Sequence, residues 1–79
     1  MIRTYFVVDD ICIFYGNDPI RPWESRDSTY QALVANRTDA DTAVALLNRA
    51  LKQQASRRYT ASAKLIAQAE SIPGFQWTV

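Results

Sequence analysis

The sequence predicts a single small α+β domain, and three observations support this fold class. Two short runs rich in β-branched and aromatic residues open the chain, which is typical of paired strands. Apolar residues recur at helical spacing through the second half. A length of 79 residues allows one hydrophobic core, so both kinds of element are expected to share one domain over residues 1–79. We therefore expect an N-terminal β-hairpin packed against two or three helices.

The predicted hairpin consists of residues 2–8 and 11–15, joined by a turn at Asp9-Asp10. If Val8 pairs with Ile11, side-chain alternation divides the hairpin into two faces. One face carries Phe6, Val8, Ile11 and Ile13, and the other carries Tyr5, Val7, Cys12 and Phe14. Both faces are apolar, although a hairpin with one wet side would alternate with polar residues. Helices can cover one face, and the other needs a further element, a second copy of the chain or a partner.

Residues 16–27 predict a loop, because Gly16 and two prolines interrupt the strand pattern. Ser28 and Gln31 fit a capping box, which predicts a short helix to about Asn36. Thr38 is expected to cap the next helix. The apolar stripe of that helix comprises Ala40, Val44, Leu47, Leu51 and Ala55.

The sequence leaves open whether residues 38–71 form one helix or two. A single helix would leave the chain too elongated to bury its hairpin, which favours a break near Gln54–Arg57 and a last helix from about Arg58 to Ser71. Pro73-Gly74 ends that helix. Phe75 to Val79 can then add a short third strand beside the hairpin.

The composition argues against an enzyme, a metal site and a bound cofactor. Histidine is absent, which removes the usual general base, imidazole-dependent triads and most zinc sites. Cys12 is the one cysteine, and its place between two isoleucines indicates a packed thiol rather than a nucleophile. Asp9, Asp10 and Asp18 could hold a divalent cation through oxygen ligands, but acids also suit a turn.

The chain is expected to be a cytoplasmic protein without a membrane segment. Its longest apolar run, Ile11 to Tyr15, is far shorter than the roughly 20 residues that cross a bilayer. The start at Met1 does not resemble a secretory signal, and a lone cysteine suits the reducing cytosol. We also expect the chain to be a free-standing gene product.

The charges separate along the sequence into an acidic first half and a basic second half. Residues 1–41 have a net charge of −3, and residues 42–79 have a net charge of +4. The basic residues Arg49, Lys52, Arg57, Arg58 and Lys64 could follow a phosphate backbone on adjacent helices. They could equally form a solvated helix exterior, and a pI near 7.9 is low for a nucleic-acid-binding protein.

The segment from Pro19 to Trp23 is the most suggestive loop in the sequence. Its two prolines restrict the backbone, and Ile20, Arg21 and Trp23 are residue types that anchor protein interfaces. These three residues are the predicted partner-binding site. The alternative is that Trp23 folds back to cover the core.

These observations predict a non-enzymatic protein–protein interaction module. By base rate alone, a protein this small could be a phage or mobile-element inhibitor of a host system, in the manner of anti-CRISPR proteins. A homodimer formed through the second hairpin face would fit this role. Two alternatives stay open: a small nucleic-acid-binding or regulatory protein that uses the basic helices, and a structural subunit of a phage particle or larger complex.

Overall fold

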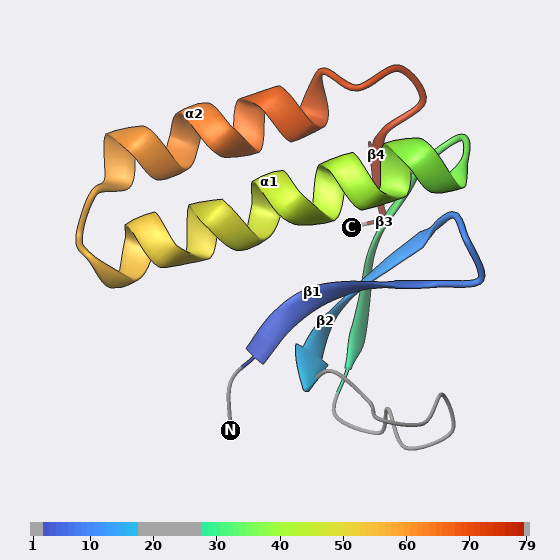
Figure 1. Cartoon of the computed structure of the whole chain (residues 1–79), viewed down its shortest axis with the longest axis horizontal. Coiled ribbons are helices and arrows are strands. Elements are labelled where there is room, and N and C mark those ends of the chain that lie inside the picture. The colour runs from blue at the N-terminus through green and yellow to red at the C-terminus, as the bar shows by residue number, and fades with distance from the viewer. Residues whose placement is uncertain (1–2, 18–27, 79) are drawn as a thin grey trace.

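The structure is a computed structural model that describes residues 3–17 and 28–78. Those residues form an antiparallel sheet of four strands and two helices, with strand order β1-β2-β3-β4, as Figure 1 shows. The elements are β1 (Arg3–Val8), β2 (Cys12–Asn17), β3 (Thr29–Leu33), α1 (Arg37–Ala55), α2 (Tyr59–Glu70) and β4 (Gln76–Trp77). The expected α+β class, the N-terminal hairpin and the short C-terminal strand are confirmed.

The hairpin turn is confirmed, but its predicted register is wrong. Asp9 and Asp10 both adopt left-handed backbone, with φ of 53° and 67°, which acidic side chains tolerate. Val8 pairs with Cys12 rather than with Ile11, so the connection contains three residues. A register change of one residue moves every side chain of β2 to the opposite face. The prediction failed because it assumed the commoner two-residue turn.

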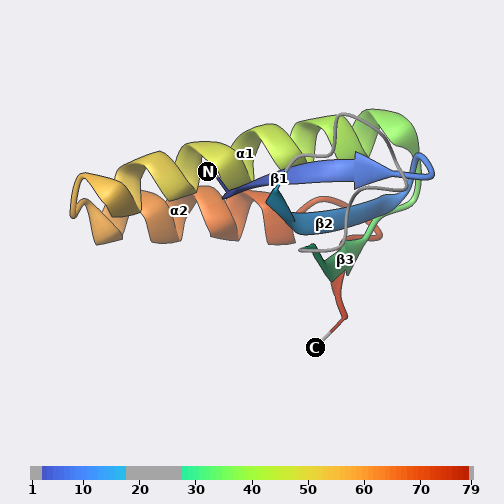
Figure 2. The same ribbon diagram turned by 90° about the horizontal axis from the view of Figure 1, so that it is seen from below.

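The observed register divides the hairpin into a face toward the helices and a face away from them. Val7 pairs with Ile13, and both belong to the core with Tyr5. The opposite face carries Phe6 and Phe14, which pair with each other. Both helices lie on one side of the sheet (Figure 2), so no described helix covers this second face. We call it the open face and define it by Phe6, Val8, Cys12, Phe14, Tyr30 and Leu33.

The short helix predicted from Ser28 to about Asn36 is wrong, because most of this segment is strand β3. Its backbone pairs antiparallel with β2, for example Ala32 with Ile13. A helix this short has few hydrogen bonds to offset the cost of nucleation, whereas a strand beside β2 gains partners at once. β4 pairs with β3 and not, as predicted, beside the hairpin; Ala32 lies opposite Trp77.

The break between the two long helices is confirmed, and α1 begins slightly earlier than predicted. Asn36 caps α1, because its Oδ1 accepts a hydrogen bond of 2.9 Å from the Asp39 backbone N–H. Thr38 is therefore not the cap. The buried residues of α1 are Ala40, Ala43, Leu47 and Ala50. The predicted stripe contained only Ala40 and Leu47 of these, because it did not allow for a second contact face toward α2.

Candidate functional site

The two helices form a hairpin whose turn extends beyond the end of the sheet. Figures 1 and 2 agree that the end of α1 and the start of α2 project past the strands. All five basic residues singled out in the sequence lie in this turn or within six residues of the adjoining helix ends. We call this surface the basic tip and define it by Arg49, Lys52, Arg57, Arg58, Tyr59 and Lys64, all of which are exposed.

The basic tip is compact along the helix axes. Arg49 lies six residues before the end of α1, and Lys64 lies five residues after the start of α2. At about 1.5 Å of rise per residue, both lie within roughly 10 Å of the turn. The folding of the chain therefore concentrates the five cations at one end of the molecule.

The turn itself is a Schellman motif that places an arginine at the position where this motif usually has glycine. The Arg58 N–H donates to the Gln53 carbonyl at 2.8 Å, and the Arg57 N–H donates to the Gln54 carbonyl at 2.9 Å. Arg57 is the left-handed residue of this motif, with φ of 59°. Left-handed backbone disfavours a side chain with a Cβ, so the turn holds its arginine against a local conformational preference.

Small side chains hold the two helices together near the tip. Ala50 of α1 and Ser62 of α2 are buried, and Leu65 adds the larger apolar group. The Gln54 side-chain amide donates a hydrogen bond of 2.9 Å to the Ser62 hydroxyl, which satisfies this buried polar group. The end of α1 and the start of α2 are therefore packed against each other and do not project as two separate helix ends.

The cations of the basic tip have no ion-pair partner among the described carboxylates. Within residues 3–17 and 28–78, both ion pairs belong to Arg37, at the opposite end of α1. No acidic residue occurs between Asp41 and Glu70. The field of the basic tip is therefore not neutralised by described neighbours.

The opposite end of α1 is acidic and internally paired. The Arg37 guanidinium contacts Asp41 at 3.0 Å and Asp10 at 3.2 Å, which joins the hairpin turn to the start of the helix. Hydrogen bonds to Asp41 and then Asp10 raise the pKa of Arg37 above its ordinary value. Because α1 has 19 residues, roughly 28 Å separate its acidic start from its basic end. The charge asymmetry of the sequence is therefore also a spatial asymmetry.

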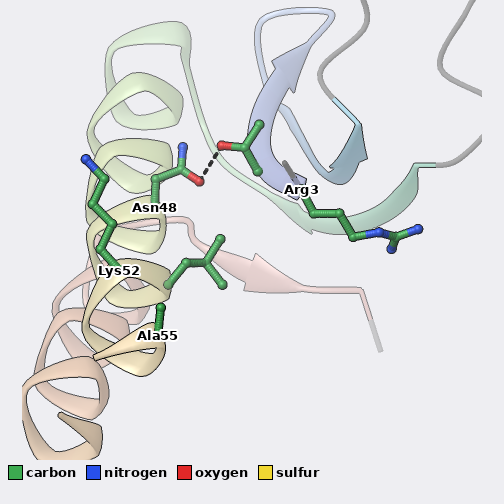
Figure 3. A pocket seen from close by; sticks show the side chains of 6 residues that line it. Arg3, Asn48, Lys52 and Ala55 are labelled. Atoms are coloured by element: carbon green, nitrogen blue, oxygen red, sulfur yellow. Dashed lines mark hydrogen bonds between the residues drawn. The ribbon is translucent and has the colours of Figure 1, made fainter. Parts of the chain in front are cut away.

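A groove connects the basic tip to the start of β1 (Figure 3). Its volume is about 270 Å³, and its lining consists of Arg3, Thr4, Asn48, Leu51, Lys52 and Ala55. Asn48 forms the junction of helix and sheet at this groove. Its Oδ1 accepts from the Tyr5 N–H and the Thr4 hydroxyl, each at 2.8 Å, and its Nδ2 donates to the Tyr5 carbonyl at 3.0 Å.

Asn48 therefore occupies part of the outer edge of β1, as a neighbouring strand would. The sequence reasoning missed this residue. A polar side chain on α1 beside Leu47, on the side that packs against the sheet, was the available signal. Asn48 therefore joins α1 to β1 through its hydrogen bonds, and these contacts give it no catalytic role.

The open face carries a row of three aromatic rings. The Phe6 and Phe14 centroids lie 6.1 Å apart, and the Phe14 and Tyr30 centroids lie 5.3 Å apart, in stacked geometry. Tyr30 and the nearby Ile11 are 38% and 37% exposed. Cys12 is half-buried on this face and does not belong to the core cluster, where the sequence had placed it.

The remaining predicted sites are placed only in part. Ile20, Arg21 and Trp23, the predicted partner-binding residues, lie outside the described residues, as does Asp18 of the weighed cation site. Asp10 of that site pairs with Arg37 instead. The described residues contain no grouping of three potential metal ligands. In the same residues, no helix combines the length and apolarity needed to span a bilayer.

Comparison of the chain with protein-family models, with curated proteins and with solved structures found no match. Two surfaces stand out, the basic tip and the open face. They differ in charge, since one is strongly cationic and the other is apolar.

Proposed function

We propose that this protein acts by binding rather than by catalysis, and that the basic tip engages a negatively charged partner. The observation that carries the proposal is the gathering of five exposed cations at the free end of the helical hairpin, without a described carboxylate among them. A protein with a net charge of only +1 has no general attraction to anions. The basic tip would instead attract anions locally, through its own five cations.

The shape of the molecule supports the same proposal. The tip extends beyond the sheet, so a large partner can approach the turn and both helix ends without meeting the strands (Figure 1). The sequence contributes the absence of histidine, which removes the commonest catalytic acid and base. Binding through charge needs none of that chemistry.

Finer expectations from the sequence stay predictions within this proposal. They include a cytoplasmic location, a phage or mobile-element origin and inhibition of a host assembly in the manner of anti-CRISPR proteins. The loop containing Ile20, Arg21 and Trp23 remains a predicted second contact.

A second candidate function is protein association through the open face, with another copy of the chain as the simplest occupant. The exposed ring of Tyr30, stacked on the half-buried Phe14, favours it, because aromatic groups are enriched in interfaces. Phe6 of the same row is buried and would contribute no contact area. Light scattering at micromolar concentration tests this candidate. A mass of two chains supports it, and a mass of one chain contradicts the homodimer.

Chromatography on immobilised heparin tests the main proposal. At a pH near 7.9 the net charge is close to zero, so retention must come from a local cationic surface. We compare a double neutralisation at the tip, Arg57→Gln with Arg58→Gln, with the single reversal Arg37→Glu at the acidic end. Both changes lower the net charge by two units, from +1 to −1.

The proposal predicts that the tip variant elutes at clearly lower salt than the Arg37→Glu variant. Circular dichroism melts confirm that each variant is folded. Equal elution of the two variants would show that net charge alone governs retention, and it would contradict a binding surface at the tip.

A further inference from the structure

We infer that the anionic partner of the basic tip is single-stranded nucleic acid, with the cations on its phosphates and a base stacked on Tyr59. This inference rests on the proposed function and gives its partner a chemical class. DNA and RNA share the required chemistry, which is a repeating phosphodiester and bases with accessible faces. Four features favour this partner: the kind of cation, the position of Tyr59, the backbone of Arg57 and the cations on either side of the groove.

The cations of the tip are mainly arginines, and two of them form the turn. Arg57 and Arg58 follow each other, with Arg49 one and a half turns before the end of α1. A guanidinium presents a planar set of donors that matches the oxygens of a phosphate group, and it stacks on bases as well. Lysine supplies a point charge that suits a backbone of variable geometry. Arginines at the turn with lysines on the flanking helices fit a flexible polyanion.

Tyr59 adds a surface that an acidic protein partner would not require. It is 66% exposed, although it is a large and mostly apolar side chain. None of the ring contacts among the described residues involves Tyr59. An aromatic ring that is exposed directly beside Arg57 and Arg58 resembles the stacking platforms used for unpaired bases. Bases in a duplex are already stacked on one another, so the platform favours a single strand.

The backbone of Arg57 supports the same conclusion. A glycine would suit its left-handed φ of 59° better than an arginine does. Strained positions of this kind concentrate at sites that contact ligands. The position of Arg57 is consistent with a side chain that is needed at the tip of the turn.

The groove between the tip and the sheet has a cation on each side, and Figure 3 shows the two charged groups pointing away from each other. Lys52 belongs to the basic tip and also lines the groove, whose other end is marked by Arg3. The Arg3 guanidinium lies 5.9 Å from the centroid of the Tyr15 ring. A strand held at the tip could therefore pass over Lys52 toward Arg3, and Arg3 is expected to contribute less than the arginines of the turn.

Fluorescence anisotropy with labelled oligonucleotides tests the inference on the full chain. The probes are oligo(dT) and oligo(U) of about 12 nucleotides, a duplex of the same length, and poly-L-glutamate as a competitor without bases. The variants are Arg57→Gln with Arg58→Gln, its charge-matched control Arg37→Glu, and the pair Tyr59→Leu and Tyr59→Phe. Circular dichroism melts establish that each variant is folded.

We expect the wild-type protein to bind a single strand more tightly than the duplex, with affinity that falls steeply between about 50 and 200 mM salt. The double neutralisation abolishes most of this binding, and Arg37→Glu leaves it within about twofold. Tyr59→Leu weakens it at least roughly fivefold, while Tyr59→Phe, which retains the ring, restores it. Comparison of oligo(dT) with oligo(U) then shows whether DNA or RNA is preferred.

Three kinds of result would overturn the inference, and they differ in what they imply for the proposed function. Equal binding of poly-L-glutamate, still dependent on Arg57 and Arg58, would exclude nucleic acid as the specific partner but retain an anion-binding tip. Binding of no anion, or binding unaffected by the double neutralisation, would overturn both. Binding that does not respond to Tyr59→Leu would exclude base stacking and overturn the single-strand assignment.

Discussion

The two ends of α1 differ in how completely the chain satisfies its own groups. At the start, Asn36 caps the helix, Arg37 joins two carboxylates, and the adjoining sheet encloses the core residues Ile13 and Ala32. At the end, an arginine occupies a left-handed position, and five cations lack a described acidic partner. Charges are paired within the described residues at the start of α1 and are left unpaired at its end.

This difference indicates that the two ends of α1 contribute differently to the stability of the fold. The sheet end supplies stability, because a domain of 79 residues has little apolar surface to spare. The basic tip keeps charge that folding does not use, and such charge lowers stability slightly through mutual repulsion. Three substitutions test this comparison, beginning with the largest expected effect.

Truncation of the core should have the largest effect on stability. Leu47 is 1% exposed and lies in the main core cluster, so Leu47→Ala is expected to lower the free energy of unfolding by about 2–5 kcal/mol. Leu51→Ala, one turn later and only partly buried in the groove, provides the matched control and should cost less. Urea unfolding measures both. A larger loss for Leu51→Ala would contradict the placement of the core at the sheet end.

The junction between the two regions should show an intermediate effect. Asn48→Ala removes the three hydrogen bonds to Thr4 and Tyr5 and is expected to cost about 1–2 kcal/mol. Lys52→Ala, on the same side of the helix, retains those hydrogen bonds and should leave unfolding nearly unchanged. Hydrogen exchange at the Tyr5 amide provides a local readout. Continued protection of that amide in Asn48→Ala would show that Asn48 is not its partner.

The two long helices could be predicted from the sequence because the apolar spacing that indicates them is local, whereas the break between them required a non-local consideration. The break between α1 and α2 follows from the length of the segment and the need to cover the hairpin. The cationic residues were likewise visible in the sequence, since Arg57 and Arg58 are adjacent. Their gathering at one end depends on a turn that sends α2 back beside α1.

The sheet was harder to predict because its pairing is not local. Ser28 and Gln31 match the pattern of a capping box, which indicates a helix. The segment forms strand β3 because its backbone pairs with the edge of β2, and this pairing cannot be seen in the local sequence. The register error at Val8 arose in a similar way, since two-residue and three-residue turns differ by one residue in a sequence that is apolar on both faces. Asn48 was missed because its partners on β1 lie more than 40 residues away.

The smallest stability effect tests the central claim most directly, because stability and binding should change in opposite directions. Arg57→Gly replaces a left-handed arginine with the residue that this position favours, and we expect unfolding to become harder by up to about 1 kcal/mol. The same protein loses one of the five cations of the tip. Arg58→Gly removes an equal charge at a residue with negative φ, so it should lower stability.

The most direct test measures two quantities on the same sample of Arg57→Gly. These are the free energy of unfolding in urea and the affinity for a single-stranded oligonucleotide. The account predicts a more stable protein that binds several-fold more weakly than wild type. A protein that is more stable and binds equally well would show that Arg57 has no role in binding. A protein that is less stable would contradict the conformational assignment of the turn itself.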